Sequence, residues 1–565
     1  MKQPVRIIAG LALLLLAVFL VYYPSLRNNF IYWDDYPQII NNPAAHSLGL
    51  PQLNRIFGTQ IVGMYQPLSS LYYALIYQLG GANALVFHSA SLALHLLNII
   101  LVFFLLLPLL SPTLALAATA LFALHPAQVE SVAWISASSN LLSSALMLGS
   151  LLAYRRYLTK TKTINLAVAL IFGTAAIFTK PSAIILPLLW MLADWWYLGK
   201  LSWKSLGGTK IVLWFSAFLM GVATIIARMA AGHFIESFYQ YSWWEKIILI
   251  CDTIKSYLLT MLWPSRLSPF YPYPAKANGY LAWPVLAAPV FIALIAYLLW
   301  RLRRQRWLLL LAGWIMINLA LVIRFTPVGR LYLADRYLYL PIIASAAGIV
   351  LLLSKFPRLA GLDRPLNNAG IYIFSSLLIV YGFLSLQQSQ IWQDDLSLHS
   401  AAIARYPRHP EMSFVYDNLA NALLRLGRVD DAKAAIDTAL RLNPELGASY
   451  NNRGLIYMAY LGQPKAALAD FDSALALAPD SHIYHFNKAL VLAKLSRQRE
   501  ALIELNLAIK LAKPLPAEYL CQRAAWTKTA QPEQAARDLA QARLLLKDAV
   551  PLAGQPVFIK TSCPL

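Results

Sequence analysis

Two adjacent carboxylates, Asp34 and Asp35, lie in the segment FIYWDDYPQIINNP at residues 30–43. They follow the first long apolar run of the chain, which places them at a membrane surface. An acidic pair without compensating charge costs desolvation and mutual repulsion there, so such a pair is typically functional. We take it as the candidate reacting centre of a membrane enzyme.

Further polar residues fall on the same face of the membrane when the apolar runs are counted as crossings. They suggest transfer from a lipid-linked donor, because a carboxylate can take the proton of an acceptor hydroxyl while cations stabilise a leaving phosphate. Structural ion pairs, such as Glu130 with Lys180, are the alternative. The candidates are Asn42, Gln66, His125, Glu130, Lys180, Arg228, Arg330, Arg336 and Tyr337.

Metal ligands and disulfides do not follow from the sequence. His88, His95 and His125 lack a ligand spacing, so no metal is required, although a divalent ion stays open. The three cysteines are far apart and odd in number, which predicts neither a disulfide framework nor a metal site.

Composition excludes an ordinary soluble domain. The chain has 565 residues, of which 59% are hydrophobic and 13% charged, with a net charge of +21. Many basic residues cluster between apolar runs, which is the positive-inside pattern of cytoplasmic loops rather than a nucleic-acid-binding face. The clusters are Arg155, Arg156, Lys160 and Lys162; Lys200, Lys204 and Lys210; and Arg301, Arg303, Arg304 and Arg306.

Apolar runs predict an all-α, polytopic domain of about eleven membrane crossings over residues 1–389, with interfacial helices in the first outer loop. The run 247–263 carries Asp252 and Lys255 and is assigned to the interface, which keeps Arg301–Arg306 cytoplasmic. The N-terminus is expected to be cytoplasmic, with the first run retained as a span rather than cleaved. The spans are 7–23, 84–108, 113–124, 141–157, 163–178, 182–196, 211–228, 281–300, 306–324, 338–354 and 370–388.

The chain after residue 390 contains a repeat. Ala432 recurs as Ala467, Ala501 and Ala535 at spacings of 35, 34 and 34 residues, and Gly427 recurs as Gly462. This pattern predicts a tetratricopeptide (TPR) α-solenoid of three to four repeats. We expect it at 413–550, after a connecting helix at 390–412 and before a tail at 551–565. Such arrays typically bind proteins, with a packing or oligomerisation element as the alternative.

Motif order gives a resemblance to a known family. WDDYPQIINNP, QPLSSLYYALIYQLGGANALVFHSASLALHLLN, LFALHPAQVESVAWIS, TKPSAIILP and DRYLYLP, with TPR repeats behind, resemble the transmembrane and TPR repeat-containing (TMTC) proteins and their bacterial relatives. The resemblance covers nearly the whole chain. It implies a GT-C glycosyltransferase fold and transfer of a hexose, typically mannose, from a polyprenyl or dolichyl phosphate to Ser or Thr of a protein.

The resemblance also assigns residues. It gives Asp34 and Asp35 the catalytic role, makes His125 and Glu130 site-lining, and places Lys180 and Arg336 near the donor phosphate. Two departures stand out: the family usually reads RPL where this chain has Gln66-Pro67-Leu68, and an arginine and then an acid where it has Ser138 and Asn140. These departures affect which sugar-lipid donor is expected, and they leave the candidate base of the acidic pair, Asp34 or Asp35, unchanged.

Three function hypotheses follow. The first is an inverting glycosyltransferase in a bacterial inner membrane, with its TPR domain in the periplasm recruiting the acceptor protein and with no cofactor beyond the lipid-linked donor. In this hypothesis, Asp35 is expected to be at least as important for glycosyl transfer as Asp34. The second is a non-catalytic, membrane-anchored TPR scaffold. The third, a transporter, is disfavoured because the polar groups gather at one face instead of mid-membrane.

Overall fold

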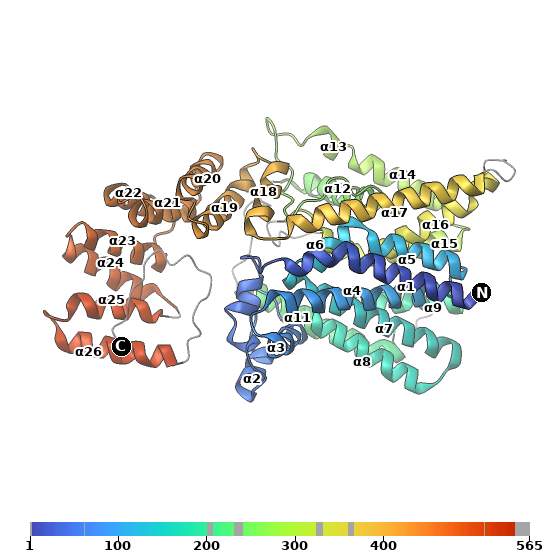
Figure 1. Ribbon diagram of the computed structural model, residues 1–565, viewed down its shortest axis with the longest axis horizontal. Coiled ribbons are helices and arrows are strands. Elements are labelled where there is room, and N and C mark those ends of the chain that lie inside the picture. Colours follow the sequence, from blue (N-terminus) through green and yellow to red (C-terminus); the bar gives the residue numbers. More distant parts are fainter. Residues whose placement is uncertain are drawn as a thin grey trace. The chain divides into compact units, whose positions relative to one another are not determined.

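The computed structural model describes residues 3–61, 63–199, 207–230, 241–323, 331–359, 366–513 and 515–547 (Figure 1). Within these ranges the chain is helical, and its only β pairing is two isolated bridges. The chain divides into two compact units at Ser397 and Leu398. The predicted all-α class is confirmed.

The first unit contains long apolar helices that run alongside one another, with α1 packed on α4 and α17, α4 on α7, and α7 on α8 (Figure 1). Seven are long and apolar enough to cross a membrane, an eighth span is a pair bent by 56°, and three apolar helices are shorter. They coincide one for one with the predicted spans, so the protein is a multi-pass membrane protein. The seven candidate spans contain α1 (Gln3–Tyr22), α4 (Ala84–Leu106), α7 (Ser138–Lys160), α9 (Leu186–Leu198), α11 (Ile211–Ala230), α14 (Ala288–Arg301) and α17 (Leu366–Ile391). The bent pair is α5 (Pro112–Leu124) with α6 (Val129–Ala133), and the shorter apolar helices are α8 (Thr163–Thr179), α15 (Arg306–Leu319) and α16 (Pro341–Leu359).

Small residues and one buried ion pair hold the bundle together. A Cβ at Gly173 of α8 would come within 2.8 Å of Leu213 Cδ2 and 3.0 Å of Leu186 Cδ2, so a larger residue here would require these leucine side chains to shift. Lys210 Nζ lies 2.6 Å from Asp194 Oδ2, and its side chain is 1% exposed. The sequence grouped Lys210 with the basic residues between two apolar runs. Its burial in η7 was not predicted, and the Asp194 carboxylate compensates the cost of burying the ammonium.

Short elements between the spans carry most of the predicted site. The amphipathic helix α12 (Trp243–Leu262) is not among the candidate spans in the described residues, in keeping with its predicted interfacial place. The connecting elements are η1 (Tyr23–Arg27), η2 (Tyr36–Ile40), η3 (Pro43–Ala45), α2 (Leu50–Gly58), α3 (Pro67–Gly80), η4 (Pro126–Gln128), η5 (Ile135–Ala137), η6 (Pro181–Ile185), η7 (Gly208–Lys210), α13 (Trp283–Leu286) and η9 (Asp335–Leu338).

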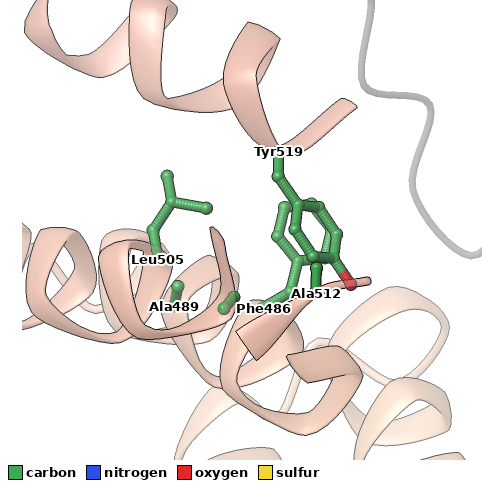
Figure 2. Packing of buried hydrophobic residues seen from close by; sticks show 6 residues of the cluster. Phe486, Ala489, Leu505, Ala512 and Tyr519 are labelled. Carbon is green, nitrogen blue, oxygen red and sulfur yellow. The ribbon is translucent and has the colours of Figure 1, made fainter. Parts of the chain in front are cut away.

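The second unit is a stack of four antiparallel helix pairs behind α18 (Asp395–Arg405) and η10 (Pro410–Met412). The repeated alanines are buried at the pair interfaces, and Phe486 stacks on Tyr519 with ring centroids 4.2 Å apart (Figure 2). The predicted TPR solenoid is confirmed. Its helices are α19 (Ser413–Arg425), α20 (Val429–Leu442), α21 (Gly447–Ala459), α22 (Pro464–Leu477), α23 (His482–Lys494), α24 (Gln498–Leu511), α25 (Ala517–Thr527) and α26 (Pro532–Lys547).

Two details of this unit refine the sequence analysis. Cys521 on α25 is 2% exposed and disulfide-bonded, which the cysteine spacing did not indicate, because sequence separation does not show which sulfur atoms meet in space. The turns between helices place Gly427 and Gly462 at φ 74° and 62°. The corresponding turn residue of the third repeat, Ser496, has φ 61° although it carries a Cβ.

Replacing Ser496 by glycine is expected to stabilise the TPR unit by about 0.5–1 kcal/mol, because glycine adopts the left-handed region without a Cβ penalty. Gly462→Ala is the matched opposite, since a Cβ there meets nothing within 4 Å and tests the backbone alone. The temperature dependence of limited proteolysis of the full-length protein, read over residues 413–547, measures both changes. Equal midpoints in the two variants would contradict the strain at Ser496.

Candidate functional site

The acidic pair lies between η1 and η2, and its two carboxylates have different surroundings. Asp35 is fully buried: Oδ1 accepts hydrogen bonds from Ser136 N at 2.8 Å and Ser136 Oγ at 2.5 Å, and Oδ2 accepts one from Ile31 N at 2.9 Å. Burial raises the pKa of Asp35 to about 7, and these hydrogen bonds oppose the rise. Asp35 therefore fixes the loop to the segment preceding α7.

Asp34 is half-buried, and no described residue donates a hydrogen bond to its carboxylate. Burial raises its pKa above the ordinary range, while the charges of Arg336 and Lys180 act in the opposite direction. A carboxylate with a raised pKa and unoccupied acceptor positions can take a proton from a hydroxyl. Of the two residues, Asp34 has the geometry of a base, and Asp35 has that of its support.

Arg336, in η9, is held on several sides. Its guanidinium pairs with Glu130 of α6, and its backbone N–H donates to the other Glu130 oxygen at 2.7 Å. The guanidinium carbon lies 5.4 Å from the Trp134 ring centroid and 5.0 Å from that of Tyr337. The structural ion pair considered from the sequence therefore exists, but Glu130 forms it with Arg336 rather than with Lys180.

Lys180, in the turn between α8 and η6, makes fewer polar contacts than Arg336 among the described residues. Its Nζ donates to Ser139 Oγ at 3.3 Å, and among the described residues no carboxylate lies within 4 Å of it. Burial lowers the pKa of Lys180 to about 7, Arg336 adds to this effect, and Glu130 and Asp34 oppose it. An added anion would find at Lys180 a positive charge that no ion pair has neutralised.

A small cavity of about 50 Å³ opens beside Arg336, between α7, η6, α15 and the start of α16. Half of its lining residues are polar and uncharged, and the buried Nδ2 of Asn140 has no partner among the described residues. The polar and charged residues lining it are Asn140, Ser143, Ser144, Ser182, Asn318, Arg336, Tyr337 and Tyr339.

An apolar groove of about 80 Å³ is lined by other turns of α7, α15 and α16, together with residues of α4 and α9. On α7 the cavity is lined by residues 140–147 and the groove by Leu151 and Arg155; on α15 the order is Asn318 and then Trp314. The polar cavity and the apolar groove therefore follow one another along one seam of the bundle.

The remaining predicted site residues are placed as follows. His125 is buried, caps η4 by accepting from Ala127 N at 3.2 Å, and packs edge-on against Tyr381. Asn42 caps η3 and donates to Gln38 O at 2.9 Å. Both are thus structural caps in this geometry.

Gln66 and two arginines complete the set. Gln66 precedes α3, and its buried Oε1 has no protein partner. Arg228 is half-buried in the last turn of α11 and does not line the cavity, as far as the described residues show. Arg330 lies outside the described residues.

Sequence reasoning missed several uncharged residues. Ser136 anchors Asp35, Ser139 contacts Lys180, and Trp134 lies under Arg336. Their only signal was membership of the segment ESVAWISASSN, next to residues singled out for charge. Among the described residues no group of three or more His, Cys, Asp or Glu could hold a metal ion.

Comparison with known proteins identifies both halves of the chain. The tetratricopeptide repeat family matches residues 413–446 and 459–516. The chain is 33% identical over 195 residues to "Protein O-mannosyl-transferase Tmtc1" of Drosophila melanogaster, covering 33% of this chain and 23% of that protein. It is 25% identical over 529 residues to "Protein O-mannosyl-transferase TMTC1" of Homo sapiens, covering 79% of this chain and 57% of that protein.

A third relative, "Protein O-mannosyl-transferase F38B6.6" of Caenorhabditis elegans, is 23% identical over 466 residues, covering 76% of this chain and 62% of that protein. The chain thus spans less than two thirds of the length of these relatives. Fold and site define a multi-pass helical membrane protein with a polar, charged site and a TPR unit. Within that class the chain is TMTC-like, and the resemblance found in its sequence is confirmed.

The division of roles in the acidic pair predicts different effects on stability. Asp35→Ala leaves the buried Ser136 and Ile31 donors without an acceptor and is expected to cost at least about 2 kcal/mol. Asp34→Ala removes no hydrogen bond and is expected to cost less than about 1 kcal/mol. Thermal unfolding of both variants in detergent measures the difference, and equal losses would contradict the supporting role of Asp35.

Proposed function

We propose that the protein is an inverting glycosyltransferase of the GT-C type, which moves a hexose from a polyprenyl-phosphate donor to Ser or Thr of an exported protein. One observation carries this proposal: a half-buried carboxylate, to which no described residue donates a hydrogen bond, lies within electrostatic range of two cations, next to a second carboxylate that holds it in place. The names of the relatives support protein O-mannosyl transfer as the reaction class.

In the proposed reaction Asp34 takes the proton of the acceptor hydroxyl as its oxygen attacks the anomeric carbon. The bond from that carbon to the phosphate oxygen breaks, and polyprenyl phosphate leaves with the bonding electrons. Lys180 and Arg336 stabilise the negative charge that develops on the phosphate. The acceptor proton therefore ends on Asp34, and the electron pair of the broken bond ends on the phosphate.

The cavity and groove suggest how the donor lies. The phosphate end takes the position next to Lys180 and Arg336, and the isoprenoid chain follows the apolar groove along α7 and α15. The unpartnered Asn140 amide is available to the polar part of the donor. In this arrangement Asn140 and Gln66, which replace charged residues of the family pattern, contact the donor as neutral hydrogen-bonding groups.

The TPR unit is proposed to recruit the protein acceptor on the outer side of a bacterial inner membrane. The disulfide at Cys521 supports an exported location, because disulfides persist in oxidising compartments. The alternative function, a non-catalytic TPR scaffold, draws support from the loss of charge at Gln66, Ser138 and Asn140. It gives no account of why Asp34 is held by a buried partner beside two cations.

Asp34→Asn is expected to lower transfer at least about 100-fold, because the amide cannot accept the acceptor proton. Intact masses of exported proteins, from a deletion strain complemented with each variant, measure the loss of the hexose increment. Asp394→Asn, an adjacent-acid change outside the site, is the control and should complement fully. Full transfer by both Asp34→Asn and Asp35→Asn would leave the scaffold as the better function.

Lys180 predicts an alkaline limit on donor use. Because its pKa is lowered to about 7, the side chain carries its charge below that pH and loses it above. The kcat/KM for the donor should therefore fall about tenfold per pH unit above neutrality, since this parameter reports the free enzyme. Lys180→Arg should move the decline to higher pH, whereas an unchanged profile would show that Lys180 does not bind the phosphate.

A further inference from the structure

The segment 392–395, at the end of the first unit, contacts the loop that carries the acidic pair. Residues 28–31 have no regular secondary structure, so their backbone groups need partners outside the loop. Asn29 N donates to Gln393 O at 2.9 Å, and Tyr32 N donates to Asp395 Oδ1 at 2.6 Å. Asn28 Nδ2 donates to Trp392 O at 3.0 Å.

Aromatic stacking extends this contact to the cation side of the site. Trp392 is 1% exposed and stacks on Trp134, with ring centroids 5.4 Å apart and planes 20° apart. Trp134 also contacts Trp33, the neighbour of Asp34, at 5.9 Å, and it lies under the Arg336 guanidinium. The segment 392–395 thus contacts the loop that carries Asp34 directly. It contacts Arg336 indirectly, through the ring of Trp134.

We propose that Asp395 and Trp392 are positioning residues for Asp34, and we name Trp392, Gln393 and Asp395 the loop clamp. The inference rests on the proposed function but assigns residues that neither the sequence motifs nor the comparisons single out. The clamp acts on Tyr32 and Asn29, while Asp35 acts on Ile31 between them. Together, the clamp and Asp35 hold the backbone of this loop in one conformation. The Asp34 carboxylate is thereby kept in the position that proton transfer from the acceptor hydroxyl requires.

The chain offers a matched control in the neighbouring acid. Asp394 Oδ1 accepts from Ser397 N at 2.8 Å and caps α18, whereas Asp395 reaches across to the loop. Alanine at either position removes a carboxylate that accepts a hydrogen bond from a backbone N–H. Only the change at Asp395 releases the loop that carries Asp34. Comparing the two variants therefore distinguishes an effect on loop positioning from an effect on the cap of α18.

Asp395→Ala in the full-length protein is expected to lower kcat about 10- to 100-fold, as expected for a displaced catalytic group, and to change the donor KM less than about twofold. Asp395→Asn should restore most of the rate, because its amide oxygen still accepts from Tyr32 N. Asp394→Ala should keep kcat within about twofold of wild type. A kcat of Asp395→Ala equal to that of Asp394→Ala, or no rescue by asparagine, would overturn the clamp.

Two further measurements keep the test decisive. Hydrogen exchange of the peptide covering 28–36 should be faster in Asp395→Ala than in Asp394→Ala, which is readable even if the variant is poorly active. In an Asp34→Asn background, Asp395→Ala should lower the residual rate no further, since the positioned group is already absent. Undiminished transfer by Asp34→Asn itself would refute the proposed function; an inactive Asp34→Asn with a fully active Asp395→Ala would refute only the clamp.

Discussion

The hydrogen bonds from Ser136 to Asp35 are the constraint on which the site depends. They join a loop after the first span to the segment that begins α7, 101 residues later in the chain. A fully buried carboxylate is costly unless donors surround it, and here Ser136 supplies two and Ile31 a third. Because Asp35 is satisfied in this way, its neighbour Asp34 is left half-buried, without a donor in the part of the chain that the structure describes, and within the electrostatic influence of Arg336 and Lys180.

From this anchor, α7 orders the rest of the site. Ser136 holds Asp35, Ser139 contacts Lys180, residues 140–147 line the polar cavity, and Leu151 and Arg155 line the apolar groove. With a rise of about 1.5 Å per residue, this sequence of contacts extends over most of the thickness of a membrane. An amphiphile with a sugar, a phosphate and a long apolar chain presents its parts in the same order.

The charges near Asp34 nearly balance without any ligand. Glu130 is paired with Arg336, so this arginine contributes a fixed, oriented donor array more than a free charge. Lys180 has no carboxylate within 4 Å among the described residues, which leaves it as the group that responds to an added phosphate and to pH. The ion pair and the lone lysine therefore have different tasks, although both were predicted simply as phosphate-binding cations.

The sequence by itself determined the helical class, the positions of the apolar helices and the TPR repeat. These follow from apolar run length and from a period of 34 to 35 residues, which are local properties. Tertiary structure alone decided which carboxylate is buried, that Glu130 pairs with Arg336 and not Lys180, and that His125 and Asn42 are caps. It also decided that Lys210 is buried against Asp194 and that Cys521 is disulfide-bonded. Each of these depends on which partner a polar group meets when it leaves water, and that partner comes from a distant part of the chain.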